Sequence, residues 1–388
     1  MIIKKYIEKK HKVYEIFGIK IKVLNQKKQD KTIRKYKKHE QAYIPCNTNS
    51  ETVSINLVGD LMCETFCQQT CIYDESYFFK DCFSLAKPIL QDADFTIGNL
   101  ESTISENHPY MGKASRLNGN YNCNSPVEFL DAVKYAGFNV LVAANNHNLD
   151  AQRQGHFDTI RHIEEYGFKY TGIYKDENQQ RYLILEKNGI KIGVLSYYTV
   201  HNKITHDFAG SDIDILFNKY SVEKVKQDVN ILKQNGVDYI MAYIHWGIER
   251  VHTTTPYQQK TAKEMAEAGV DYILGSHPHA LQPYEELIVG NRTVPVIYSL
   301  GNFLSSSRLG QCTRDTIILQ LELEKQNGKC CLVRNEYVPC QIFDYFEGRN
   351  LPIIPLNDKF NGGIKSPLFT KSIKRIKNIL GKKIKMRK

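Results

Sequence analysis

Short apolar runs alternate with helix-period segments along the chain from about residue 52. Runs rich in Val, Ile, Leu and Tyr predict strands at 53–59, 94–98, 139–144, 182–186, 190–196, 238–245, 271–275 and 295–300. Apolar positions spaced three or four apart predict helices at 77–91, 127–136, 151–166, 221–235 and 257–268. This alternation predicts a layered α/β fold with a largely buried sheet.

Two further strands follow residue 310, in the stretches DTIILQLELE and KCCLVRNEYV. A turn at Asn327 and Gly328 would join them as an antiparallel pair, which extends the sheet or packs a second sheet against it. No Pro- or Ser-rich linker and no internal repeat interrupts residues 52–345. We therefore expect one large domain over 51–345, with a basic tail on each side, at 1–50 and 346–388.

Charge separates these tails from the body. Residues 1–40 contain 14 Lys/Arg and 4 Asp/Glu, and residues 359–388 contain 11 Lys/Arg and no acidic residue. Because the whole chain carries +10, residues 41–358 carry −11. An acidic body repels phosphate backbones, so a nucleic-acid partner is disfavoured despite the overall basicity.

The C-terminal tail has apolar residues at near-helical spacing among lysines and arginines, at Ile373, Ile376, Leu380 and Ile384. This pattern is typical of an amphipathic helix lying on an anionic membrane surface. A disordered basic tail is the alternative. The N-terminal tail has one strand-like stretch, IKIKV at 19–23, and no predicted role.

The chain has 388 residues, 42% of them hydrophobic and 24% charged, which indicates a folded protein with a sizeable core. It shows neither a run of about 20 apolar residues nor a signal peptide's apolar centre. We expect a cytoplasmic protein with peripheral contact at the inner face of the membrane.

Ten cysteines are spread over a chain that is far larger than disulfide-stapled secreted domains. Reduced thiols are the simplest interpretation. Cys63, Cys67 and Cys71 would lie along one face of a helix and could bind a metal ion. Their spacing matches neither the CxxC pairs of zinc sites nor an iron–sulfur loop, so the metal interpretation is disfavoured.

Polar side chains of metal-binding type follow six of the predicted strands. In an α/β sheet such strand ends gather functional groups at one edge. The side chains in these positions are Asp60, Asn99, Glu101, Asn145, Asn146, His147, His245, His277, His279 and Asn302.

These groups form a mixed oxygen and nitrogen ligand set without thiolate, which suits Mn²⁺, Fe or Zn²⁺. Each position alone is weak evidence for a metal site, since a single buried His is more often a core residue than a ligand. The ordered combination favours a site with one or two divalent metal ions. The HxH pair, His277 and His279, can supply one imidazole to each of two neighbouring ions.

The blocks VGDLM, IGNLE, NSPVEFLDAVKYAGFNVLVAANNHNLD, YIHWGIE, GVDYILGSHPHALQP and IYSLGNF cover about residues 53–304. Their order resembles the capsule synthesis CapA family, also called poly-gamma-glutamate biosynthesis proteins, of the calcineurin-like metallophosphoesterase superfamily. The resemblance implies a four-layer α/β/β/α sandwich of the metallo-dependent phosphatase type. It also implies a cell-surface polymer or its precursor as partner.

The resemblance further implies the role of each site residue. Asp60 would bind the first ion, Glu101 would bridge both, and Asn146 and His245 would bind the second ion. His277 would join the second ion and His279 the first. His147 would be the general acid that protonates a leaving oxygen.

Three positions depart from the pattern. Met62 stands where phosphoesterases have His, Gln152 stands where the CapA family usually has Gly, and no acidic residue follows SLGNF. The loss of an imidazole at 62 weakens the first ion position. The favoured function is a metal-dependent, phosphoesterase-like hydrolase of surface-polymer biosynthesis. The alternative is a non-catalytic accessory of a membrane-associated polymer assembly complex.

Overall fold

The computed structural model describes residues 51–73, 76–110, 116–117, 120–202, 206–305, 313–361 and 363–387, together with three strands before them. The chain divides into two compact units, Met1–Asn49 and Ser50–Lys388. The first unit contains a three-stranded antiparallel sheet of β1 (Lys4–Glu8), β2 (His11–Ile16) and β3 (Ile19–Leu24). The second unit contains the site and is described below.

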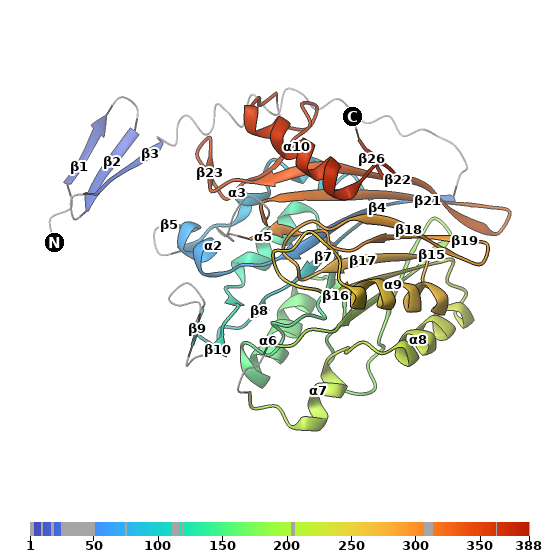
Figure 1. Ribbon diagram of the computed structural model, residues 1–388. Coiled ribbons are helices and arrows are strands. Elements are labelled where there is room, and N and C mark those ends of the chain that lie inside the picture. The colour runs from blue at the N-terminus through green and yellow to red at the C-terminus, as the bar shows by residue number, and fades with distance from the viewer. Residues whose placement is uncertain are drawn as a thin grey trace. The chain divides into compact units, whose positions relative to one another are not determined.

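The first sheet of this unit joins strands from both ends of the predicted domain (Figure 1). Its order is β13 (Lys169–Thr171), β12 (Val140–Val142), β7 (Phe95–Leu100), β4 (Glu51–Leu61), β21 (Asp315–Gln326), β22 (Lys329–Ile342) and β25 (Ile353–Pro355). Strands β4, β7, β12 and β13 are parallel, and β21, β22 and β25 extend the sheet in antiparallel fashion. Two short strands, β20 (Asn302–Leu304) and β26 (Lys385–Met386), pair with β4 and β22.

The second sheet is built from the middle of the chain. Its order is β14 (Leu183–Lys187), β15 (Ile190–Tyr198), β16 (Tyr239–His245), β17 (Tyr272–Ser276), β19 (Arg292–Ile297) and β18 (Tyr284–Val289). Its four central strands are parallel, and β14 and β18 close its edges in antiparallel pairs.

Helices cover the outer faces of both sheets. The first sheet packs against α3 (Lys80–Phe83), α4 (Lys87–Leu90), α5 (Glu128–Ala136) and α6 (Gln152–Glu165). The second sheet packs against α8 (Val222–Gln234) and α9 (Pro256–Ala268). Shorter elements are α2 (Thr65–Thr70), α7 (Gly210–Leu216), β5 (Ile72–Tyr73), β6 (Ser76–Tyr77), β8 (Thr103–Ile104), β9 (Arg116–Leu117), β10 (Asn120–Tyr121), β11 (Asn124–Ser125), β23 (Tyr345–Phe346) and β24 (Arg349–Asn350).

Besides the two apolar cores between each sheet and its helices, a third apolar core lies between the two sheets. It contains Leu57 and Ile97 from the first sheet and Val194, Met241 and Leu274 from the second, all of them buried. The inward side chains of both sheets therefore pack face to face, with helices outside them. The expected four-layer α/β/β/α sandwich is confirmed.

The predicted helix over 77–91 is wrong in one respect, because the segment forms two short helices. Pro88 lies in the first turn of α4, where its missing N–H is tolerated. Inside one continuous helix it would remove a hydrogen bond and clash with the preceding turn. The turn at Asn327 and Gly328 is as predicted, with φ of +52° and +76°.

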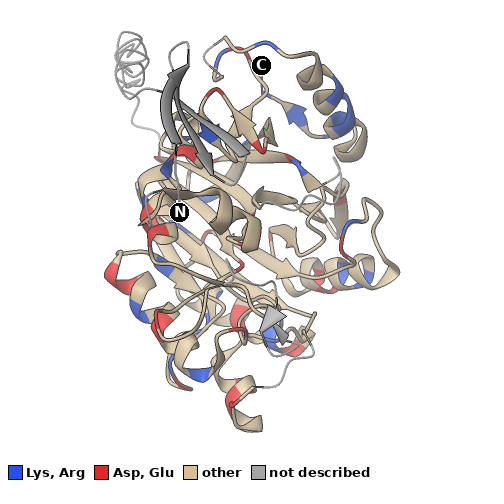
Figure 2. Cartoon of the chain, turned by 90° about the vertical axis from the view of Figure 1, so that its left-hand side faces the viewer, with Lys and Arg blue, Asp and Glu red and all other residues tan. Residues whose placement is uncertain are grey.

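Residues beyond 346, expected as a tail, pack on the body in the second unit. Helix α10 (Pro367–Leu380) buries Phe369, Ile376 and Leu380 in the core between the sheets. The predicted apolar stripe is therefore present, but it contacts protein and is not available to a membrane. Lys and Arg positions, blue in Figure 2, recur along this helix, and Lys371, Lys374 and Lys377 are exposed.

None of the helices in the described part of the chain combines the length and apolar character that a membrane crossing requires.

Candidate metal centre

Parallel strands of both sheets end at the site, and the strand register places its polar side chains. In the first sheet, Asp60 pairs in register with Asn99 of β7 and Asn302 of β20. In the second sheet, His245 ends β16 beside Ser276, the last residue of β17. The carboxyl ends of parallel strands thus supply donors to one place from both sheets.

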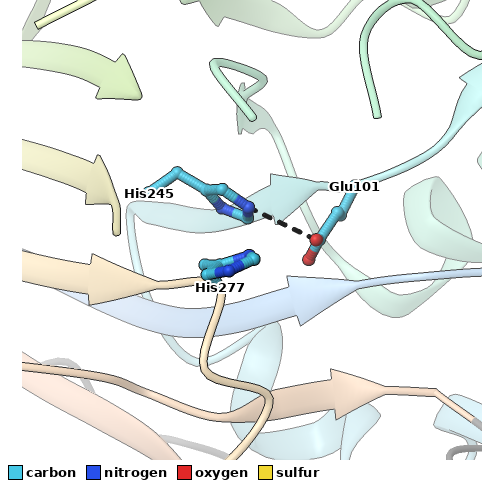
Figure 3. Close-up of side chains that lie close together, drawn as sticks. All are labelled: Glu101, His245 and His277. Carbon is cyan, nitrogen blue, oxygen red and sulfur yellow. Dashed lines mark ion pairs between the residues drawn. The ribbon is translucent and has the colours of Figure 1, made fainter. Parts of the chain in front are cut away.

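Glu101, Asn146 and His245 meet at one ring nitrogen. His245 Nε2 lies 2.6 Å from Asn146 Oδ1 and 3.4 Å from Glu101 Oε1. Its other nitrogen, Nδ1, lies 3.0 Å from Ser276 Oγ. His277 completes the group, because ligand atoms of Glu101, His245 and His277 all lie within 4.8 Å of one another (Figure 3). Residues predicted for the second ion are therefore brought together.

A second group forms around Asp60 and His279. Asp60, Glu101 and His279 each offer a ligand atom within 4.8 Å of the other two. Asn99 donates from Nδ2 to Asp60 Oδ1 at 2.8 Å. His279 Nδ1 lies 2.9 Å from Asn302 Oδ1, which only accepts, so this nitrogen carries the proton. This leaves His279 Nε2 as the nitrogen that could bind a metal ion, an arrangement that hydrogen-bond partners of metal ligands commonly produce.

Glu101 lies between these groups and is the least compensated side chain of the site. It is fully buried, and within the described residues neither carboxylate oxygen has a hydrogen-bond partner. Burial, followed by the charge of Asp60, raises its pKa well above the usual value. An unpaired buried carboxylate costs several kcal/mol. A cation beside Glu101 removes that cost, so the residues fit a bound metal ion.

The three imidazoles differ in protonation. Burial lowers the pKa of His245 to about 3 and the pKa of His277 well below its usual value. Both rings are neutral at pH 7, which is the form that binds metal. Burial also opposes protonation of His279, but the charge of Glu101 and the hydrogen bond and charge of Asp60 raise its pKa to about 10. The positive charge of the His279 imidazolium compensates the negative charges of Asp60 and Glu101. A bound metal ion can take over this compensation.

The backbone of the HxH segment is strained. His277 has φ of +91° and His279 has φ of +53°, in the left-handed region that non-glycine residues rarely adopt. Such conformations cost of order 1–3 kcal/mol and cluster at functional sites. Here the bends aim the two rings at different groups, with centroids 5.9 Å apart. That the HxH pair serves two ion positions stays a prediction.

A buried carboxylate holds His147, the predicted general acid. His147 Nδ1 lies 2.7 Å from Asp150 Oδ2, which also accepts the backbone N–H of Cys123 at 2.7 Å. His147 Nε2 lies 4.0 Å from Glu101 Oε1, on the side of the ligand groups. Burial disfavours the imidazolium, but the charge and hydrogen bond of Asp150 outweigh it, so the pKa of His147 is raised.

Asp150 and Ser276 are site residues that the sequence pattern did not indicate, and Asn99 is a strand-end residue to which it gave no role. Asp150 lies two residues before Gln152. Its role depends on how the turn after β12 folds back onto His147, which residue spacing does not reveal. Asn99 and Ser276 orient Asp60 and His245 from neighbouring strands.

The departures from the family pattern have local explanations. Met62 is buried against Cys123 and offers a thioether where the pattern has an imidazole. The first ion position therefore lacks that nitrogen. Gln152 has φ of +61°, a conformation that favours glycine. This accounts for the Gly that the resembling family usually has at that position.

The predicted helix face of three cysteines is present only in part, because α2 covers only Thr65–Thr70, although the Cys67 thiol contacts those of Cys63 and Cys71. Cys67 lies inside this helix, whereas Cys63 and Cys71 lie outside it. All three are buried thiols. Within the described ranges, no cysteine joins a group of three side chains placed to hold a metal ion.

Comparison with known proteins identifies the family. The family model described as bacterial capsule synthesis protein PGA_cap matches residues 54–307. The chain belongs to this family. The matched range of PGA_cap contains His147 and all six predicted metal ligands. The expected resemblance to capsule synthesis proteins is confirmed.

Curated relatives of the PGA_cap chain carry capsule and PGA biosynthesis names. It is 29% identical over 319 residues to the capsule biosynthesis protein CapA of Bacillus anthracis, covering 80% of this chain and 72% of that protein. It is 29% identical over 290 residues to the PGA biosynthesis protein CapA of Bacillus subtilis (strain 168), covering 72% and 70%. The solved calcineurin-like phosphoesterase YfkN from Bacillus subtilis is structurally similar, with a TM-score of 0.47 and 14% identity, covering 85% of this chain and 97% of that one.

Proposed function

We propose that the chain is a metal-dependent hydrolase of the phosphoesterase type that acts on a cell-surface polymer or its precursor. One observation carries the proposal. Both oxygens of the fully buried Glu101 carboxylate lack a hydrogen-bond partner among the described residues, while the imidazoles of His245, His277 and His279, at the strand ends of the second sheet, lie beside it. The polymer is inferred from membership of the PGA_cap family.

In this function, the side chains of the site hold the cations and orient the reacting groups. Asp60, Glu101 and His279 would hold one cation, and Glu101, Asn146, His245 and His277 would hold the other. The donor set contains oxygen and nitrogen only, which favours Mn²⁺, Fe or Zn²⁺. The chemistry supplied by such cations is a lowered pKa of bound water and compensation of charge on the transferred group.

His147 supplies the proton in this proposal. The Asp150 carboxylate accepts the His147 Nδ1 proton, which fixes the ring and leaves Nε2 directed at the ligand groups. A raised pKa favours the protonated ring, which can give its Nε2 proton to a departing alkoxide. Asp150 is therefore a positioning residue for the general acid.

A second candidate is a non-catalytic accessory of a membrane-associated polymer assembly complex. Met62 favours it, because the first ion position lacks the imidazole that the phosphoesterase pattern has there. In such a protein the site would bind polymer or a partner, and the basic surfaces would contact an anionic membrane at the cytoplasmic face.

Metal analysis and assays of the purified chain test these candidates. We expect bound Mn, Fe or Zn and turnover of a phosphomonoester or phosphodiester in a broad substrate panel. Bound metal in stoichiometric amount without turnover on the panel rejects the hydrolase and favours the accessory. A chain that binds no divalent metal at all contradicts the metal centre itself.

A further inference from the structure

The segment between β16 and α9 lies against the HxH segment. Gly247 and Arg250 adopt φ of +94° and +64°, so the chain bends sharply on both sides of Glu249. The Arg250 backbone N–H donates to Pro278 O at 2.6 Å. Pro278 stands between His277 and His279. Glu249 is thereby tied to the residues that carry two of the predicted ligands.

Glu249 reaches the metal centre from its open side. One of its carboxylate oxygens and one ring nitrogen each of His277 and His279 all lie within 4.8 Å of one another. Its side chain is 44% exposed, whereas Asp60 and Glu101 are fully buried. Glu249 also forms an ion pair with Arg250, whose Nη2 lies 3.6 Å from Glu249 Oε2.

We infer that Glu249 is a third carboxylate ligand of the centre and binds a divalent cation from the solvent side. This inference rests on the proposed function. An independent observation points to a ligand here: His277 is 4% exposed, and its Nδ1 has no hydrogen-bond partner in the described part of the chain. Glu249 thus supplies a donor to a centre that has lost an imidazole at Met62.

The donor chemistry agrees with this role. Carboxylate oxygen and imidazole nitrogen together suit Mn²⁺, Fe or Zn²⁺. Asp60, Glu101 and Glu249 bring three negative charges, which balance two divalent cations more closely than two carboxylates can.

The test is a Mn²⁺ titration of the metal-free full chain, with unbound Mn²⁺ followed by electron paramagnetic resonance. Glu249→Gln keeps the size of the side chain and removes its charge. We expect at least about 10-fold weaker binding at one site, since even indirect partners of metal ligands change affinity about 10- to 100-fold. Glu249→Asp, which is shorter by one methylene, is expected to fall between Glu249→Gln and the parent chain.

Glu267→Gln is the matched control, because Glu267 lies exposed in the last turn of α9 and forms an ion pair with Lys263 at 3.8 Å. It makes the same charge change outside the site and is expected to leave Mn²⁺ affinity unchanged. Repeating the titration in about 1 M salt, where screening acts within about 3 Å, removes a long-range charge effect but not the loss of a ligand.

The outcomes separate this inference from the proposed function. A parent chain that binds Mn²⁺ with the same affinity as Glu249→Gln overturns the role of Glu249 and leaves the metal centre standing. A difference that disappears in high salt also overturns it. A parent chain that binds no Mn²⁺ overturns both.

Discussion

Individual side chains of the site have separable tasks, as the contacts of His147 and His245 show. His245 Nε2 lies within 3.4 Å of both Asn146 Oδ1 and Glu101 Oε1, whereas His147 Nδ1 is engaged by Asp150. In the proposed function, His245 would hold a cation and His147 would hold a proton. Substitution of the two rings should therefore affect different measurements.

We expect His245→Ala to lower metal content, because it removes a nitrogen from the centre of the ligand group. His147→Ala should retain metal and reduce turnover about 10²- to 10⁴-fold, the usual contribution of a general acid. Metal analysis and kcat on the same preparations check this. Equal loss of metal in both variants contradicts the proton-donor role of His147.

A residue outside the site, His156, should contribute to a different property, the pH dependence of stability. Its Nε2 lies 2.8 Å from Tyr174 O, and its ring packs against Phe157, Phe208 and Phe217. Burial, with a smaller effect of the Arg153 charge, lowers the pKa of His156 to about 4.

Because this pKa is below that of the unfolded chain, about 6.5, the unfolded state binds the proton more readily between these values. The contribution of His156 to the free energy of unfolding is fully present above about pH 6.5 and falls as the pH drops toward about 4. We expect a loss of about 2 kcal/mol between pH 7 and pH 5 from this group. Urea unfolding of the parent chain and of His156→Gln should show that loss only in the parent; parallel curves contradict it.

At the scale of elements, the position of Asp60 depends on the close approach of β4 to the segment before β20. The Asp60 backbone N–H donates to Gly301 O at 3.0 Å. A Cβ built on Gly59 would lie 1.9 Å from that same oxygen. Only glycine allows these two backbones to approach so closely, so Gly59 sets the place of the first ligand.

We expect Gly59→Ala to lower the free energy of unfolding by about 1–3 kcal/mol, as overpacking of buried groups does. It should also weaken Mn²⁺ binding, because β4 must move at Asp60. Gly210→Ala is the control, since a Cβ there meets no atom within 4 Å. Urea unfolding and Mn²⁺ titration measure both effects; unchanged values for Gly59→Ala contradict the close approach.

Elements also show what could be predicted from sequence. Strong apolar runs and Gly-terminated helices located most strands and helices, because their patterns are local. The division of the strands between two sheets could not be predicted, since β4 joins β21 across more than 250 residues of chain. The proposed roles of Asp150 and Glu249 could not be predicted either, since they depend on how loops fold against the imidazoles. For α10, the apolar stripe predicts a buried helix face but not which surface covers it.

For the whole molecule, burial of the α10 stripe leaves charge as the means of contact with a membrane. Lysines at 371, 374 and 377 on α10 and at 382, 383 and 385 beyond it are exposed, while Ile376 and Leu380 are buried. Residues 1–40 add 14 Lys/Arg against 4 Asp/Glu. Basic residues near an anionic surface each contribute about 1 kcal/mol, and salt screens that attraction.

We therefore expect the full chain to bind phosphatidylglycerol-containing vesicles at low ionic strength and to be released by salt, without insertion. The triple substitution of Lys371, Lys374 and Lys377 by Gln should weaken binding by about 10-fold or more, since about 3 kcal/mol is at stake. A control variant with Gln at Lys226, Lys260 and Lys263, on α8 and α9, has the same net charge as the first triple variant. It should bind vesicles nearly as well as the parent chain. Vesicle sedimentation across a salt series measures this. If both triple variants weaken binding equally, the C-terminal surface has no special part in it, and binding that persists in high salt contradicts contact through charge.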